Sequence, residues 1–259
     1  MSSAVRVTVE GPIAEVRLDG PEKHNVLDLA GWNALAAAFA ALSARTDIRC
    51  VTVRGTGGRA FSAGSDISAF SGQRVTPDDV RGYSAAISGA MHAIRDCPHP
   101  TVALIEGICV GGGLEIAVCC DIRACEASSQ FGAPINRLGL TMSYDELDPI
   151  VRLVGAGPAL DLLLTGDLIP SAAARRMGLV SRVAPDGEVV SRGRDLAGRI
   201  AAGAPLVNRW HKKFIRRLAD PAPLTEVERE ESHAAFETDD YREGRTAFME
   251  KRPPTFTGE

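Results

Sequence analysis

The sequence has 259 residues, of which 45% are hydrophobic, and it carries a formal net charge of -4 at pH 7. This length and apolar content suffice for one large domain with a buried core, whereas the acidic balance argues against a nucleic-acid partner, which would require a basic face. The six cysteines form no C-x-x-C pair and have no histidine at zinc-ligand spacing, so we expect buried thiols in a reducing compartment and no metal site. No apolar stretch has the length of a membrane span or of a secretory signal core, and the sequence therefore predicts a cytoplasmic protein with no membrane partner.

The first part of the chain predicts two strands, a helix and a further strand. Residues 5–9 and 13–18 alternate between apolar and polar side chains, with a Gly-Pro turn between them, which indicates a hairpin. Asp28 then caps a helix, and residues 49–54 form a short buried strand. The apolar face of the helix consists of Trp32, Leu35, Phe39 and Leu42.

Residues 59–67 are small side chains around one phenylalanine, a composition suited to backbone that lies against a ligand. Residues 68–78 predict a mobile polar loop. Thr76 and the Pro-Asp-Asp sequence after it have the cap, the proline and the first-turn acids of a helix start. The expected core face of this helix is Val80, Tyr83, Ile87, Met91 and Ile94.

Residues 104–126 contain the segment around which the chain is organised. An apolar, β-branched strand is interrupted by Gly107 and by the triplet at 111–113, and then becomes a helix over residues 114–119. A strand that passes through glycines into a helix leaves free backbone N–H groups, which stabilise negative charge. Glu115 lies in the first turn beside those donors, where it either performs chemistry or only complements the helix dipole.

The rest of the chain predicts a strand at 121–125, helices at 143–154, 156–165 and 170–177, and a last strand at 179–183. From residue 186 onward the pattern is almost entirely helical, and residues 224–249 are amphipathic in the way of a segment that packs on a partner subunit or on the body. Alternating strands and helices predict an α/β core over residues 1–200, followed by a helical region over residues 201–259.

Two segments together resemble the enoyl-CoA hydratase/isomerase (crotonase) superfamily: A-F-S-A-G-S-D-I at 60–67 and G-I-C-V-G-G-G-L-E-I-A-V-C-C-D at 107–121. The similarity continues through residues 130–132, 139–140, 153–155, 165–166, 174–183 and 246–252. The resemblance implies a spiral of ββα units with C-terminal trimerisation helices, assembled as a homotrimer or a dimer of trimers. It also implies an acyl-CoA thioester substrate and no cofactor besides the coenzyme A of that substrate.

Carried over residue by residue, the resemblance assigns the oxyanion hole to the backbone N–H groups of Ser65 and Gly112, and an acid/base role to Glu115. Where enoyl-CoA hydratases have a second glutamate, this chain has Ile135; Asp145 or Glu146 replaces that acid, or both are ordinary first-turn acids of a helix. The resemblance places contacts to CoA and to the acyl group at Lys23, Ala60, Ala63, Asp66, Ile67, Gly111, Ile135, Phe248 and Lys251.

The resulting hypothesis is an enoyl-CoA hydratase that adds water reversibly to a 2-enoyl-CoA through an enolate, with Glu115 as the acid/base. One alternative is an enoyl-CoA double-bond isomerase, in which a single carboxylate moves a proton between two carbons. Another is a CoA-thioester-binding homologue with little hydratase activity, because the second glutamate is absent at Ile135.

Overall fold

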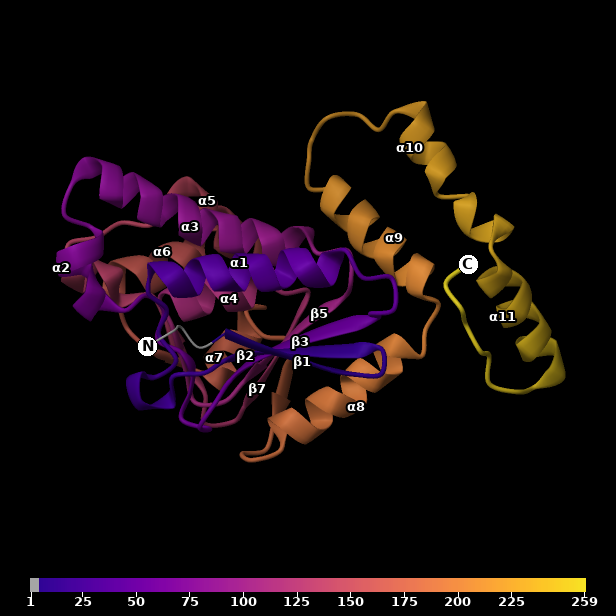
Figure 1. Ribbon diagram of the computed structural model, residues 1–259, viewed down its shortest axis with the longest axis horizontal. Helices are drawn as coiled ribbons and strands as arrows, with labels where there is room; N and C mark the ends of the chain where they lie inside the picture. Colours follow the sequence, from indigo (N-terminus) through magenta and orange to yellow (C-terminus); the bar gives the residue numbers. More distant parts are fainter. Residues whose placement is uncertain (1–4) are drawn as a thin grey trace.

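The computed structural model describes residues 5–259 and contains two β-sheets (Figure 1). In the first sheet, β1 pairs antiparallel with β2, and the remaining strands are parallel. Its six strands, in spatial order, are β1 (Val5–Glu10), β2 (Ile13–Leu18), β3 (Cys50–Gly55), β5 (Thr101–Ile105), β7 (Ile122–Glu126) and β10 (Arg182–Ala184). The second sheet consists of β4 (Ala60–Ser62), β6 (Ile108–Val110), β8 (Gln130–Gly132) and β9 (Ile169–Pro170).

The chain alternates between the two sheets. Strand β3 of the first sheet is followed by β4 of the second, β5 is followed by β6, and β7 is followed by β8. A helix then returns the chain to the first sheet, so each turn adds one strand to each sheet. The predicted spiral of ββα units is thereby confirmed. The helices in this part are α1 (Leu29–Ser43), α3 (Pro77–Asp96), α4 (Gly112–Cys119), α5 (Tyr144–Val154), α6 (Ala156–Thr165) and α7 (Ser171–Arg176).

The first sheet is covered on both faces, which explains why β3 and β5 are apolar at successive positions. Val51 and Val53 point into the larger core shared with α1 and α3, whereas Leu104 packs against α8 (Val189–Ala201) on the opposite face. A Cβ atom on Gly193 of α8 would lie 2.3 Å from a Leu104 methyl carbon, so the helix and the strand pack in direct contact. Figure 1 shows α8 below the sheet and α1 and α3 above it. All six cysteines are free and buried, as expected.

Two local predictions about helix starts are confirmed. The Asp28 carboxylate accepts a hydrogen bond from the Gly31 N–H at 2.8 Å, and Thr76 forms a capping box with Asp79 at the start of α3. Four of the five residues expected on the core face of α3 are buried, but Val80 is 43% exposed, because the first turn of this helix extends past the core.

Two other predictions need correction. Residues 68–78 are not simply a polar loop, since they include the short 3-10 helix at Ile67–Ala69 and the helix α2 (Phe70–Gln73). Phe70 packs edge-on against Tyr83 with the ring centroids 5.7 Å apart, and this contact orders the segment. The last strand covers Arg182–Ala184 rather than 179–183, because Leu179 and Val180 are buried in the core before the strand begins.

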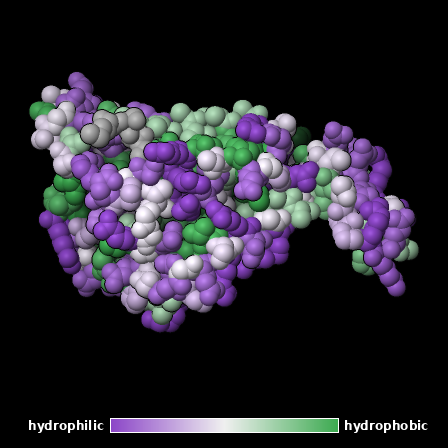
Figure 2. Space-filling model, turned by 60° about the horizontal axis from the view of Figure 1, so that its bottom comes forward, coloured by the Kyte–Doolittle hydropathy of each residue, from purple (hydrophilic) through white to green (hydrophobic). Residues whose placement is uncertain are grey.

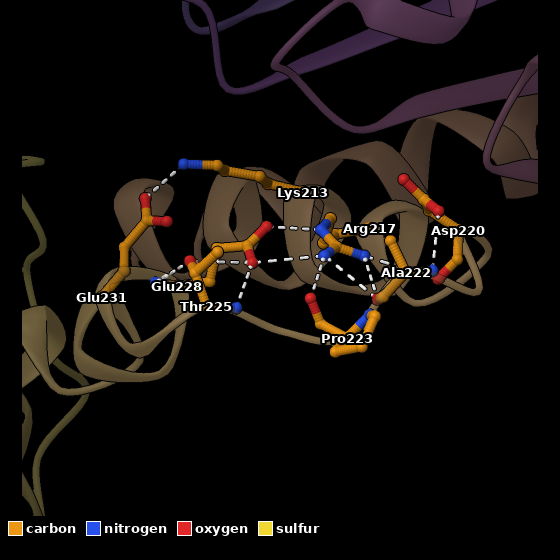
Figure 3. Close-up of polar contacts among 8 residues, drawn as sticks. All are labelled: Lys213, Arg217, Asp220, Ala222, Pro223, Thr225, Glu228 and Glu231. Atoms are coloured by element: carbon orange, nitrogen blue, oxygen red, sulfur yellow. Dashed lines mark hydrogen bonds and ion pairs between the residues drawn. The ribbon is translucent and has the colours of Figure 1, made fainter.

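The remaining helices form a C-terminal arm: α9 (Pro205–Arg217), α10 (Glu226–Glu231), the 3-10 helix at Ala234–Glu237, and α11 (Asp239–Glu250). Figures 1 and 2 show this arm projecting from the body. Helix α9 is attached through Asp121, which accepts from Lys212 at 2.7 Å and from Arg216 at 3.1 Å. Figure 3 shows how α10 is held against α9, with Arg217 pairing with Glu228 and also donating to backbone carbonyls of the connecting loop.

Several large apolar side chains of this arm remain exposed in the single chain. They are Ile215, Leu218, Val227, Phe236, Phe248 and Met249. Over residues 5–259, no helix combines the length and the apolar character that crossing a membrane requires.

Candidate active site

Two glycine-containing segments, the end of β4 and the start of α4, lie in direct backbone contact. Gly64 has φ of +89°, and a Cβ atom there would lie 2.4 Å from the nitrogen of Gly112. A Cβ atom on Gly113 would lie 2.1 Å from the carbonyl oxygen of Ser62. Only glycine permits this approach at both positions. The glycines predicted to bring backbone close to a ligand therefore also bring the two segments close to each other.

The amide N–H groups of Ser65 and Gly112 are free donors: within residues 5–259 neither donates a hydrogen bond to another backbone or side-chain group. Gly112 begins α4, so its N–H has no acceptor in a preceding turn. Leu27 forms backbone hydrogen bonds with the two residues that flank Ser65, each 2.8 Å long. Because this pairing is parallel, the Ser65 N–H points away from Leu27. Both residues line one cavity.

The Ser65 hydroxyl has a defined partner, which the sequence did not indicate. Its oxygen accepts a hydrogen bond from the indole N–H of Trp32 at 3.2 Å. The Tyr83 hydroxyl lies beside this pair and donates to the Leu27 carbonyl at 3.2 Å. Trp32 and Tyr83 are fully buried. The position of Ser65, and with it the direction of its N–H, is therefore held by the core.

The cavity has a volume of about 250 Å³ and is lined mostly by apolar residues, among them Ile67, Phe70, Ile87, Ile135, Leu140 and Met142. Ala63 and Gly111 also line it, so seven of the residues singled out in the sequence meet here with Glu115: Ala63, Ser65, Ile67, Gly111, Gly112, Ile135 and Glu146. At about 250 Å³ it lies below the ~300 Å³ lower limit of pockets for drug-sized ligands. The space suits a small organic group.

Glu115 is 4% exposed and lines the cavity from the first turn of α4. Burial and, secondarily, the charge of Glu146 raise the pKa of Glu115 to about 8, against a smaller opposing effect of Arg74. A carboxyl group that exchanges its proton near neutral pH is suited to general acid/base catalysis.

The two candidates for a second acid differ in position. Glu146 is half-buried and lines the same cavity as Glu115, whereas Asp145 is exposed and does not line it. Glu146 also belongs to the capping box of α5, where its carboxylate accepts from the Ser143 N–H at 2.5 Å. Glu146 thus has the cap contact of a first-turn acid and also lines the cavity, and its role as a second acid stays a prediction.

Three of the residues assigned to coenzyme A, Lys23, Ala60 and Asp66, are not among those that line the cavity. Lys23 pairs with Asp66 at 2.9 Å, and its side chain is 59% exposed. Ala60 is buried, and its carbonyl accepts from the Asn25 side chain at 2.7 Å.

Phe248 and Lys251 lie apart from the cavity. Phe248 belongs to α11, which Figure 1 shows at the opposite end of the molecule from α2 and α3, and Lys251 ends that helix in a left-handed conformation. Phe248 is 81% exposed. Within one chain these two residues do not join the site.

Sequence reasoning missed Arg74, Thr141 and Met142, which also line the cavity. Arg74 follows α2, in the segment expected to be a mobile polar loop. No local signal in the sequence distinguishes it from a solvated arginine.

Comparison with known proteins agrees with this arrangement. The model of the family "Enoyl-CoA hydratase/isomerase" matches residues 8–259. A probable enoyl-CoA hydratase of Mycobacterium bovis is 33% identical over 245 residues, which cover 93% of each chain. The mitochondrial Delta(3,5)-Delta(2,4)-dienoyl-CoA isomerase of Dictyostelium discoideum is 32% identical over 261 residues, covering 94% of this chain and 87% of that protein.

The crystal structure of an enoyl-CoA hydratase/carnithine racemase from Magnetospirillum magneticum superposes with a TM-score of 0.97 at 43% identity, covering 100% of this chain and 97% of the other. The match spans both sheets, the cavity and the C-terminal arm. The chain belongs to the enoyl-CoA hydratase/isomerase family.

Proposed function

We propose that this protein is an enoyl-CoA hydratase that adds water reversibly across the double bond of a short 2-enoyl-CoA. The observation that carries the proposal is the content of one cavity: two free backbone N–H groups, from Ser65 and Gly112, together with the carboxyl groups of Glu115 and Glu146.

The two N–H groups would act as an oxyanion hole. When the oxygen of the deprotonated water adds to Cβ of the enoyl thioester, the electrons of the double bond shift toward the thioester carbonyl. The negative charge then lies on the carbonyl oxygen of an enolate. Donors held in place by the backbone stabilise this charge more than they stabilise the neutral carbonyl, which lowers the barrier. Removal of one such donor typically raises a barrier by about 3 kcal/mol.

The two carboxyl groups would supply the proton transfers. Because burial raises the pKa of Glu115 to about 8, this carboxyl holds a proton near neutral pH. The ionised member takes the proton of the attacking water, and the protonated member delivers a proton to Cα. Glu115 is the principal acid/base, and Glu146 takes the place of the carboxylate that Ile135 lacks.

The C-terminal region, residues 201–259, would form the contacts of a homotrimer or a dimer of trimers. Its exposed apolar side chains require a partner, because the described part of the body, residues 5–200, leaves them uncovered in the single chain. Phe248 and Lys251 would then contribute to the acyl-CoA site of a neighbouring copy. Lys23, Ala60 and Asp66 would contact the coenzyme A portion, which is the only coenzyme in the reaction.

The proposal is tested by incubating the purified protein with crotonyl-CoA and longer 2-enoyl-CoA thioesters and following the loss of enoyl absorbance. Wild-type protein should hydrate at least one of them. Glu115→Gln should lower kcat by roughly a hundredfold or more, and Glu146→Gln by a smaller factor. Absence of turnover with tight thioester binding, or full activity in Glu115→Gln, would contradict the proposal.

An enoyl-CoA isomerase is the second candidate, and the capping box of α5 favours it. If the Ser143 N–H keeps the Glu146 carboxylate in that cap, Glu115 is left as a single working carboxyl, which suffices to move one proton between two carbons. Conversion of a 3-enoyl-CoA to the 2-enoyl product, with Glu146→Gln retaining that activity, would support isomerisation over hydration.

A further inference from the structure

Arg74 is the one cationic side chain among the residues that line the cavity. It stands at the C-terminal end of α2, and its guanidinium carbon lies 4.2 Å from the ring centroid of Phe70 and 4.0 Å from that of Tyr83. The two rings are themselves packed edge to face. Stacking on aromatic rings orients a planar guanidinium without using its N–H donors.

Those donors have no partner in the protein. Within residues 5–259 the Arg74 side chain forms no ion pair shorter than 4.0 Å and no hydrogen bond, and its Nε atom is buried. A buried guanidinium N–H is normally bonded, because leaving it unsatisfied is unfavourable by roughly 1–3 kcal/mol. The half-buried guanidinium is thus oriented by two rings, its buried Nε–H has no acceptor within the described residues, and it lines the same cavity as the two carboxyl groups.

The charge of Arg74 has only a small lowering effect on the pKa of Glu115. Glu115 and Glu146 lie in the same cavity, yet among residues 5–259 neither carboxylate forms an ion pair with the guanidinium within 4.0 Å. Around them the lining is apolar, so a neutral hydrocarbon chain would leave the Arg74 donors unsatisfied. An anionic group on the ligand would accept hydrogen bonds from the guanidinium and would pair with its positive charge.

We propose that Arg74 binds a carboxylate at the far end of the acyl group, so that the preferred substrate is a short 2-enoyl-CoA whose acyl chain carries a second, free carboxylate. This inference rests on the proposed function of the same cavity. A guanidinium and a carboxylate form two parallel N–H···O bonds, which fixes the orientation of the acyl chain as well as its affinity. The cavity volume of about 250 Å³ restricts the chain to a few carbons beyond the double bond.

The test compares two thioesters of matched shape in wild-type protein and in Arg74→Met. One is 4-carboxybut-2-enoyl-CoA; the other is 5-methylhex-2-enoyl-CoA, in which a neutral isopropyl group replaces the carboxylate. The measured quantity is the ratio of kcat/KM for the acidic thioester to kcat/KM for the neutral one. Any general loss of folding or of catalysis affects both thioesters and cancels in this ratio.

Wild-type protein should prefer the acidic thioester, and Arg74→Met should lower the ratio by about tenfold to a hundredfold, the range for hydrogen bonds to a charged group. Arg74→Lys should restore part of the preference, since it keeps the charge and loses the paired geometry. An unchanged ratio in Arg74→Met, or a wild-type preference for the neutral thioester, would overturn the inference.

If the wild-type protein turns over neither thioester, the inference is tested by binding alone, and turnover of crotonyl-CoA decides separately whether the proposed function holds. Calorimetry with the saturated pair, 4-carboxybutanoyl-CoA and 5-methylhexanoyl-CoA, measures the dissociation constant of each thioester. The ratio of the two dissociation constants then takes the place of the kinetic ratio. Preferential binding of the acidic thioester that disappears in Arg74→Met would support the role of Arg74 without hydration. Equal weakening of both thioesters would instead mean that Arg74 contacts the coenzyme A portion, and would overturn it.

Discussion

Replacement of Glu115 by glutamine should make the protein more stable while it removes activity. In the folded chain the carboxyl is 4% exposed, and burial is the main cause that raises its pKa from 4.5 to about 8. The unfolded chain loses this proton near pH 4.5, so between these pH values the folded state binds one more proton than the unfolded state. Stability from this group is therefore greatest at low pH and is lost as the pH rises toward 8.

The size of the effect follows from the same two pKa values. Ionisation of the unfolded carboxyl disfavours folding by about 3 kcal/mol at pH 7 and by about 5 kcal/mol above pH 8, compared with acid solution. Glutamine has no proton to lose, so the free energy of unfolding of Glu115→Gln should exceed that of wild type by these amounts at the same pH values. At pH 5 the difference should be less than about 1 kcal/mol. At pH 7 this corresponds to a rise in Tm of roughly 6–12 °C.

The assay is thermal and urea unfolding of wild type and Glu115→Gln at pH 5, 7 and 9, with kcat measured on the same preparations. Glu10→Gln, which changes an exposed carboxylate of β1, is the matched control and should show no such pH dependence. If Glu115→Gln is no more stable than wild type at pH 9, or if the difference between them does not grow with pH, the buried, protonated carboxyl inferred from the structure is wrong.

Three further changes test the packing around the site. Gly112→Ala would place a Cβ atom 2.8 Å from a ring carbon of Trp32, so we expect a loss of about 1–3 kcal/mol in stability and a displaced amide, seen as a lower Tm and a lower kcat. Ser65→Ala keeps the backbone N–H but removes the acceptor of the Trp32 indole; unfolding should become easier by about 1–3 kcal/mol, and unchanged stability would mean that the indole finds another acceptor. Asp121→Asn leaves the buried Lys212 without its counter-charge, so we expect a loss of about 3 kcal/mol and faster proteolysis near α9, a result that intact resistance to protease would contradict.

The starts of the helices could be predicted because their causes are local. Asp28 and Thr76 each accept a hydrogen bond from a backbone N–H three residues later, and the position of Glu115 in the first turn of a helix follows from the glycines just before it. Periodicity likewise located the hairpin and the core face of α3. Such signals depend on groups within about one turn of the chain, so the sequence contains them in full.

What the site can bind was decided by contacts between distant segments. Trp32 meets the Ser65 hydroxyl across 33 residues, and α5 packs against α4 so that Glu146 joins Glu115 in one cavity. In the sequence, nothing near Arg74 distinguishes it from a solvated arginine, and the resemblance could name Asp145 or Glu146 as a second acid but could not choose between them. The sequence alone therefore determined the elements, the caps and the glycine-rich segments. Only the tertiary packing decided which charges share the cavity, because side-chain environment depends on the segments brought together in space rather than on neighbours in the chain.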